Sequence, residues 1–385
     1  MSISFSKPYH NPNELNYISK VLQSENTIGG GSESKWCTNW LEDLTKSKKV
    51  LLTNSATDAL EMSAILLDIK EGDEIIMPSF TFSSSANAFI LQGAKPVFVD
   101  IESINLNINP ELIIGAITPN TKAILVVHYA GVACNMEKIL EICKKYNLYL
   151  VEDAAPSLMA TWNKKYLGTI GDLACFSFHS SKNIVSGEGG ALVINNSKFI
   201  ERAKIILEKG TNREQFINGV VDKYSWIDVG SSYLPSEITA AYLRSQLENA
   251  HAITAQRTNY WKLYKINLMN EAEKLGITLP NPPETAGHNA HAFFLLMPNE
   301  ESRDMFISIM KSKEVVCASH YSPLHTSKAG LKYGVVGSVM STTETIHSRL
   351  VRLPMWSQEG MPVDYVCELV IETLNSIIST PNGKQ

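Results

Sequence analysis

Residues 148–196 read LYLVEDAAPSLMATWNKKYLGTIGDLACFSFHSSKNIVSGEGGALVINN, and this stretch decides the fold. It contains three short runs in which apolar residues follow one another: LYLVED (148–153), ACFSFH (174–179) and ALVINN (191–196). Apolar residues on successive positions are expected where helices cover both faces of a strand. The stretch therefore predicts buried strands that end in polar residues and glycines.

Similar runs continue toward the N-terminus, separated by segments with helical spacing of apolar residues. The earlier strand-like runs are KVLLT (49–53), DEIIMP (73–78), KPVFVD (95–100) and KAILVVHY (122–129). The helical segments include NMEKILEICKKYN (135–147) and SKFIERAKIILEKG (197–210). This alternation predicts an α/β fold with a large, mainly parallel sheet covered by helices.

The pattern changes after Leu234, where a long helical stretch (236–276) ends at the proline-rich NPPET (281–285). We expect a large domain over residues 1–250, including an N-terminal segment, and a smaller C-terminal α+β domain over 251–385. The smaller domain is expected to contain two strands and a helix: HAFFLLMP (291–298), EVVCASHY (314–321) and SRDMFISIMKSK (302–313).

Composition excludes several classes of protein. The 385 residues include 34 Lys and Arg against 39 Asp and Glu, a net charge of −5 that disfavours nucleic acid as the main partner. No apolar run is long enough to cross a bilayer, and the N-terminus lacks the pattern of a signal peptide. We therefore expect a cytoplasmic protein that does not bind membranes.

Metal and dinucleotide sites are not indicated. The six cysteines and nine histidines show no spacing typical of metal ligands. The glycines 29–31 follow no predicted strand, and no G-x-G-x-x-G motif opens a helix, which disfavours an NAD-dependent enzyme.

In a parallel sheet, ligands bind outside the carboxyl ends of the strands. After KVLLT, Ser55 and Thr57 open a helix whose N–H groups can bind a phosphate, although the same residues can serve as an ordinary N-cap. Asp153 ends a very apolar strand, where a carboxylate can remain ionised beside a pyridinium N–H. Its alternative role is to cap the next helix.

Two further candidates follow strands. Lys182 lies between ACFSFH and a glycine-rich turn, where partial burial can make its amine a Schiff-base nucleophile, although most such lysines are simply solvated. His179 is as well explained by a buried or supporting role as by a catalytic one. Phe82 follows DEIIMP and offers an aromatic face for a flat ring, or a core side chain. Together, a phosphate cup, an aromatic ring, a carboxylate and a lysine indicate a pyridoxal phosphate site.

These motifs resemble the DegT-type sugar-nucleotide aminotransferases over nearly the whole chain. The resemblance is carried by NSATDAL, PSFTFSSSANA, GAKPVFVDIE, VEDAA, LGTIGDLACFSFHSSKN and GEGGALV. It implies the aspartate-aminotransferase fold (type I), pyridoxal 5'-phosphate as cofactor and a homodimer with shared active sites. Lys182 would bind the cofactor and move the proton, Asp153 would hold the ring nitrogen protonated, and Phe82 would stack on the ring. Ala56, Thr57 and Ser177 would bind the phosphate.

The resemblance also assigns residues to the substrate and to the partner subunit. Ser232 stands where the family has an Asn that reaches the phosphate of the partner subunit's cofactor. Tyr321 and His325 of HYSPLH match a segment near the nucleotide sugar. Arg213 and Lys223 are candidate contacts to the pyrophosphate or the sugar, with solvated surface residues as the alternative.

The chain departs from the family pattern at two positions. Pro156 replaces the Gln of EDAAQ, so the side-chain hydrogen bond expected near the cofactor hydroxyl is missing. Ala56 replaces a glycine in the phosphate cup. Both changes predict weaker retention or altered tuning of the cofactor without removal of an essential group.

The segment 208–248 and HYSPLH are most similar to the branch that transfers an amino group from L-glutamate to C4 of dTDP-4-keto-6-deoxyglucose, which gives dTDP-4-amino-4,6-dideoxygalactose and 2-oxoglutarate. The alternatives are a gluco-configured C4 product, a C3 aminotransferase, and a non-catalytic protein that binds nucleotide sugars. A dehydratase of this fold is disfavoured, because a His replaces the lysine there. The implied role is surface polysaccharide biosynthesis.

Overall fold

The computed structural model describes residues 2–378. Its centre is an eight-stranded sheet in the order β1-β9-β8-β5-β4-β2-β3-β12. All seven strand-like runs of the first two hundred residues form strands in it, as predicted. The strands are β1 (Lys49–Thr53), β2 (Glu74–Pro78), β3 (Lys95–Val99), β4 (Thr121–Val127), β5 (Tyr149–Asp153), β8 (Leu173–Ser177), β9 (Gly190–Ile194) and β12 (Val335–Val336).

Helices cover both faces of the sheet, which explains why its strands are apolar on successive residues. On one face, Leu51, Met77 and Leu125 pack with α3 (Ala56–Leu66), α4 (Ser83–Ile90) and α7 (Ile200–Leu207). On the other face, alternate strand residues pack in two clusters. The helices there are α2 (Ser32–Thr45), α9 (Glu237–Leu247), α5 (Pro110–Ala116) and α6 (Met136–Tyr146).

Within the described sheet, β9 alone runs against the other strands. It pairs antiparallel with both β1 and β8. From β8 through β5, β4 and β2 to β3, each strand is parallel to its neighbour. The registers place Gly190, the first residue of β9, opposite both Thr53 and Ser177. The carboxyl ends of β1 and β8 therefore flank Gly190 at one edge of the sheet.

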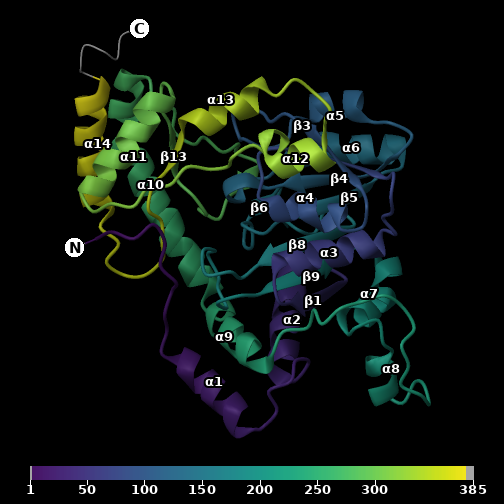
Figure 1. Ribbon diagram of the computed structural model, residues 1–385. Helices are drawn as coiled ribbons and strands as arrows, with labels where there is room; N and C mark the ends of the chain where they lie inside the picture. The colour runs from purple at the N-terminus through teal and green to yellow at the C-terminus, as the bar shows by residue number, and fades with distance from the viewer. Residues whose placement is uncertain (1, 379–385) are drawn as a thin grey trace.

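A second hydrophobic cluster lies beyond the sheet. It is built from α10 (Ala250–Leu275), α11 (Glu300–Ser312), α14 (Val363–Ile378) and the two-stranded sheet of β11 (Phe294–Leu296) and β13 (Leu350–Arg352). Ala250 and Ile253 of α10 pack against the sheet region, while Trp261 and Leu268 pack in the second cluster. Figure 1 shows α10 running from beside α9 to α11 and α14. The domain boundary near residue 250 stays a prediction.

One strand prediction is wrong. EVVCASHY (314–321) forms no strand and makes only isolated bridges, between Val315 and Ile3 and between Ala318 and Arg352. Its two bridges go to two different segments, so no continuous ladder can form. HAFFLLMP is a strand over residues 294–296 alone.

The remaining elements lie outside the main sheet and the second hydrophobic cluster, and most of them are short. They are α1 (Asn13–Gln23), α8 (Arg213–Ile217), α12 (Lys328–Tyr333), α13 (Ser341–Arg349), β6 (Thr161–Trp162), β7 (Lys165–Tyr166), β10 (Ala286–Gly287), η1 (Tyr129–Gly131), η2 (Ser197–Phe199) and η3 (Leu324–Thr326). Over residues 2–378, no helix combines the length and the apolar character that a membrane span requires.

Candidate active site

A cavity of about 380 Å³ lies where the carboxyl ends of the parallel strands meet residues of the C-terminal part of the chain. Its size is within the range of small-molecule sites. Seven of the residues predicted from the sequence line it: Ala56, Thr57, Phe82, Asp153, Ser177, Lys182 and Tyr321. Segments more than 250 residues apart in sequence thus meet in one site.

The N-terminus of α3 forms one wall of the cavity. Ser55 caps the helix: its Oγ accepts a hydrogen bond of 3.1 Å from the backbone N–H of Asp58. The N–H groups of Ala56 and Thr57 precede the first intrahelical hydrogen bond and are free of that role. Because the helix dipole is positive at this end, the wall is suited to an anionic group.

A glycine allows α3 to approach the sheet this closely. A Cβ atom at Gly190 would lie 2.3 Å from the carbonyl carbon of Ser55 and 2.4 Å from the backbone nitrogen of Ala56. Both contacts involve backbone, so a larger residue would push the start of α3 away from β9. The close approach brings Ser177, which pairs with Gly190, to the same wall as Ala56 and Thr57.

Asp153 contributes a buried carboxylate at the end of β5. Ser85 Oγ donates a hydrogen bond of 2.7 Å to its Oδ2, and the N–H of Ala155 donates one of 3.2 Å to its Oδ1. Thr81 Oγ1 lies 2.8 Å from Ser85 Oγ and holds that hydroxyl in place. In residues 2–378, no cation forms an ion pair with Asp153, so the carboxylate is available to a positively charged ring nitrogen.

Lys182 lies in the connection between β8 and β9. Its backbone N–H donates to the carbonyl of His179 at 2.9 Å, while its Nζ has no hydrogen-bond partner among the described residues. Burial and the charge of Arg352 lower the pKa of Lys182, against the opposing effect of Asp153. A larger fraction of the amine is therefore neutral, the form that attacks a carbonyl carbon.

The two aromatic candidates differ in burial. Phe82, the N-cap residue of α4, is 61% exposed in the single chain and lines the cavity. Tyr321 packs at a ring distance of 4.3 Å on His320 and 5.6 Å from Phe80. Burial raises the pKa of Tyr321, so its hydroxyl keeps its proton and can donate a hydrogen bond.

Four predicted residues do not line this cavity. The imidazole of His325 is buried elsewhere, with Nδ1 2.7 Å from Ser79 Oγ and Nε2 3.3 Å from Glu344. Arg213 pairs with Glu208 at 2.9 Å, beside α8. Lys223 and Ser232 are also outside the cavity: the backbone carbonyl of Lys223 accepts a hydrogen bond from the side-chain amide of Asn212, and that of Ser232 accepts one from the side-chain amide of Asn54. The predicted role of Ser232 toward the partner subunit's cofactor, and those of His325, Arg213 and Lys223 toward the substrate, stay predictions.

The structure adds residues that the sequence did not single out. Ser85 orients Asp153, and Tyr129, His291, His320 and Arg352 line the cavity. Ser85 could have been suspected, because it follows a strand in the same segment as Phe82. The other four residues belong to segments that come close to Lys182 only in the folded chain.

The residues present fit pyridoxal phosphate. An open helix N-terminus, a buried carboxylate with no ion-pair partner among the described residues and a half-buried amine with a lowered pKa surround one cavity. These groups match the phosphate, the pyridine nitrogen and the aldehyde carbon of the cofactor. Pro156 also lines the cavity, and its carbonyl accepts a hydrogen bond of 2.8 Å from Asn289, so the departure from the family pattern lies in the site.

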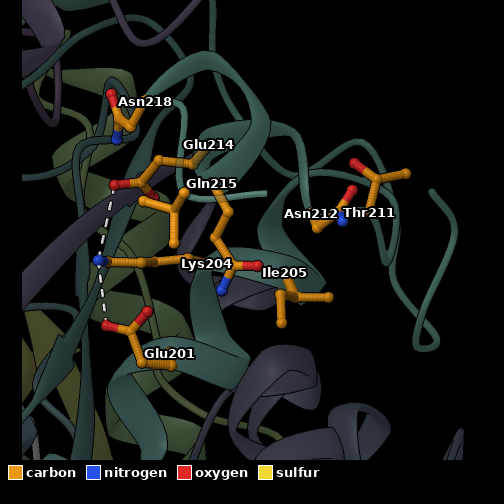
Figure 2. Close-up of a pocket in the computed structure, with 9 residues that line it drawn as sticks. Glu201, Lys204, Ile205, Thr211, Asn212, Glu214, Gln215 and Asn218 are labelled. Carbon is orange, nitrogen blue, oxygen red and sulfur yellow. Dashed lines mark hydrogen bonds and ion pairs between the residues drawn. The ribbon is translucent and has the colours of Figure 1, made fainter. Parts of the chain in front are cut away.

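A second cavity, beside α7 and α8, does not suit this chemistry. It has about 140 Å³ and its lysine is already paired: Lys204 Nζ lies 3.2 Å from Glu201 and 3.5 Å from Glu214. Figure 2 shows Lys204 held between the two carboxylates. The space is small for a cofactor, and its cation is neutralised.

Comparison with known proteins agrees with the site. The model of the DegT/DnrJ/EryC1/StrS aminotransferase family matches residues 8–371. The uncharacterized protein MJ1066 of Methanocaldococcus jannaschii is 33% identical over 382 residues, which cover 97% of each chain.

Two solved structures resemble the whole chain. S. venezuelae DesV, solved in complex with a ketimine intermediate, is 26% identical with a TM-score of 0.87, and the match covers 97% of this chain and 98% of that one. Helicobacter pylori PseC, an aminotransferase involved in the biosynthesis of pseudoaminic acid, is 23% identical with a TM-score of 0.89, covering 98% and 100%. At that identity PseC supports the fold alone.

Proposed function

Because the chain belongs to the DegT/DnrJ/EryC1/StrS aminotransferase family, we propose that it transfers an amino group from L-glutamate to C4 of dTDP-4-keto-6-deoxyglucose. The products would be dTDP-4-amino-4,6-dideoxygalactose and 2-oxoglutarate. Pyridoxal phosphate is the cofactor of this sugar aminotransferase. The single observation that carries the catalytic part of the proposal is the meeting of Lys182 and Asp153 in one cavity.

The chain's own groups have distinct tasks in this reaction. When bound, pyridoxal phosphate supplies an electron-withdrawing ring that stabilises negative charge on the reacting carbon. Asp153 holds a proton on the ring nitrogen through its carboxylate, and Ser85 keeps that carboxylate oriented. Lys182 Nζ would hold the cofactor at its aldehyde carbon, and as a free amine it would take a proton from the α-carbon of the donor and deliver one to C4 of the sugar.

The substrate assignment rests on sequence features. The segment 208–248 and HYSPLH (320–325) are similar to the branch that makes the galacto-configured C4 amine. Tyr321 of that motif lines the cavity, which supports a role close to the sugar. A gluco-configured C4 product or amination at C3 is the main alternative.

The nature of the product tests this proposal. With pyridoxal phosphate, L-glutamate and dTDP-4-keto-6-deoxyglucose, we expect a 4-amino sugar whose proton NMR spectrum shows a small coupling between H3 and H4. A small coupling indicates an axial amine, because H4 is then equatorial and is not anti to H3. The control is the same mixture without L-glutamate.

Other spectra would contradict the proposal in different ways. A large H3–H4 coupling would show the gluco-configured product. An amine on C3 from a 3-keto substrate would move the enzyme to another branch of the family. If no nucleotide-linked keto sugar gave an amino sugar, the result would favour a protein that binds nucleotide sugars and does not catalyse transamination.

We also propose that the enzyme is a homodimer with shared active sites, in which Ser232 reaches the phosphate of the partner subunit's cofactor and Arg213 and Lys223 contact the pyrophosphate or the sugar. Large apolar side chains gather without cover in and just after α8. They are Phe216, Ile217, Val220, Tyr224, Trp226, Ile227 and Val229, with exposed fractions of 45 to 79%. A monomer rarely exposes so many neighbouring apolar side chains, so this surface supports a contact between subunits.

We expect the mass in solution to be that of two chains, each of 42.6 kDa. Trp226→Asp places a charge in the proposed contact and should shift the protein toward single chains, measured by sedimentation equilibrium. Ile266→Asp is the matched control, because Ile266 is also exposed but lies on α10. A wild-type protein that sediments as one chain would refute the dimer.

A further inference from the structure

His291 is a buried histidine on the wall of the active-site cavity. The residue is 7% exposed and lines the cavity together with Lys182 and Asp153. Its backbone is held on both sides. Arg257 Nη2 donates a hydrogen bond of 2.9 Å to its carbonyl, and its own N–H donates one of 3.1 Å to Asn289 Oδ1. The imidazole therefore projects from a fixed point of the wall.

Two asparagine side chains beside His291 have orientations that their acceptors determine. Asn289 Nδ2 donates hydrogen bonds of 2.8 Å to the carbonyls of Pro156 and Leu158, which leaves its Oδ1 to accept. Asn183 Nδ2 donates one of 2.9 Å to the carbonyl of Asn289. An amide nitrogen only donates and an amide oxygen only accepts, so Oδ1 is the atom of Asn183 that faces the imidazole.

These orientations determine which nitrogen of His291 carries the proton. Asn183 Oδ1 lies 3.0 Å from Nδ1 of His291, and because that oxygen can only accept, Nδ1 is the donor. Burial, together with the charges of Arg352 and Lys182, lowers the pKa of His291 well below its usual range, so the ring is neutral. A neutral ring with its proton on Nδ1 has a lone pair and no proton on Nε2.

The Nε2 atom of His291 is an acceptor to which no described residue donates. Among residues 2–378, the ring makes its hydrogen bond through Nδ1 alone. Nε2 is not one of the buried atoms that the protein closes off, so it is open to the cavity. An acceptor without a donor in a buried site is costly, and a ligand that brings a hydroxyl or an N–H group would relieve that cost.

The two substrates of the proposed reaction differ in what they offer this acceptor. The imidazole is hydrogen-bonded to Asn183, the residue after Lys182, and the charge of Lys182 acts on it, so His291 lies close to the reacting carbon. In L-glutamate, that carbon carries a carboxylate and a CH2 group, which donate nothing, besides the amine that is transferred. In dTDP-4-keto-6-deoxyglucose, the ring carbons beside the ketone carry a hydroxyl at C3 and a methyl group at C5.

We propose that Nε2 of His291 accepts a hydrogen bond from the C3 hydroxyl of the keto sugar and makes the enzyme specific for that hydroxyl. The contact holds the sugar ring in one orientation, with C4 beside Lys182. It is made in the half-reaction with the sugar and not in the half-reaction with the amino donor. The inference rests on the transaminase function proposed above.

The test compares keto sugars that differ in one hydroxyl. The amine-loaded holoenzyme is reacted in single turnovers with dTDP-4-keto-6-deoxyglucose and with its 3-deoxy and 2-deoxy analogues, and conversion of the cofactor is followed by absorbance. In the wild type, removal of the C3 hydroxyl should lower kcat/KM by about 10- to 100-fold, because Nε2 is then left without a donor.

His291→Met replaces the imidazole with an apolar side chain. With the parent sugar it should lose about 10- to 100-fold in kcat/KM, whereas with the 3-deoxy sugar it should react at least as fast as the wild type. The effect of removing the C2 hydroxyl should be the same in both enzymes, because that group has no shared partner with His291. The half-reaction with L-glutamate should change less than about threefold, since no contact to His291 is made there.

His288→Met is the matched control. His288 lies three residues earlier, packs against Trp261 at a ring distance of 4.5 Å and does not line this cavity. The variant should react like the wild type with all three sugars.

A second variant and a binding measurement keep the test valid if His291→Met folds poorly. His291→Gln keeps an acceptor oxygen near the position of Nε2 and should recover part of the loss with the parent sugar. The keto sugar is also titrated by calorimetry into the enzyme whose cofactor is still bound to lysine, a form that cannot aminate it. The Kd should be weakened by about 10- to 100-fold in His291→Met and by less than about threefold in His288→Met.

The remaining outcomes overturn the inference or the function beneath it. Equal losses in the two half-reactions would assign His291 to Lys182 or to the fold. Lost discrimination at C2 instead of C3 would assign Nε2 to the other hydroxyl, and a wild type that reacts equally well with the 3-deoxy sugar would remove the contact altogether. These three results overturn the inference and leave the transaminase in place. A wild type that aminates no nucleotide-linked keto sugar would refute the proposed function itself.

Discussion

Lys182→Ala should lower the rate of transamination by about 10³-fold or more, because both the covalent attachment and the proton transfer depend on its amine. The structure supports this because the half-buried Lys182 lines the cavity that Asp153 shares, and its surroundings lower the pKa of its amine. Amino-sugar formation is measured under saturating cofactor. The purified variant should also lack the absorbance of a lysine-bound cofactor.

Two controls accompany this variant. Lys182→Arg keeps the positive charge but not a neutral amine, and it should be as inactive as the alanine variant. Lys49→Ala removes a lysine that pairs with Glu42 at 2.7 Å, at the start of β1, and should retain nearly full activity. Normal turnover by Lys182→Ala would remove Lys182 from the mechanism.

Asp153→Asn should lower the rate by about 10²- to 10³-fold, the range typical of removing one electrostatic partner of a transition state. The amide oxygen can still accept the hydrogen bonds that Ser85 and Ala155 now donate, so the fold should persist. What is lost is the negative charge that keeps the ring nitrogen protonated.

Asp172→Asn is the matched control for Asp153. Asp172 accepts a hydrogen bond of 3.0 Å from the N–H of Leu150, at the opposite end of β5, and it lies outside the cavity. It should affect stability more than rate. If Asp153→Asn kept wild-type rate constants in both half-reactions, Asp153 could not be the partner of the ring nitrogen.

The sheet was predictable because its information is local. Apolar runs bounded by polar residues and glycines identify strands wherever other elements cover both faces of the strand, as in LYLVED. EVVCASHY has the same local composition but no single neighbour to pair with, since Val315 contacts Ile3 and Ala318 contacts Arg352. Strand pairing is a tertiary property that a short run does not encode.

The site also has a part that local sequence patterns predict and a part that they do not. Ala56, Thr57, Phe82, Asp153, Ser177 and Lys182 follow strands of one sheet, so their convergence was expected before the structure. Arg352 reaches the cavity from a two-stranded sheet, 170 positions after Lys182, and no local motif indicates it. His325 shows the reverse: it belongs to a motif near the cavity, but its ring turns to Ser79 and Glu344.

The reversal of β9 has a consequence for how Lys182 can move. The connection from β8 to β9 leaves and re-enters the same edge of the sheet, and it is tied across itself by hydrogen bonds from Phe178 to Gly189 and from Ser186 to Phe178. The lysine backbone is thus anchored on both sides, so its amine can only swing on its four-carbon stem about a fixed pivot. Such a pivot would confine proton delivery to one side of a flat ligand, so the hairpin that carries the lysine, together with the orientation of the bound substrate, would determine the handedness of the product.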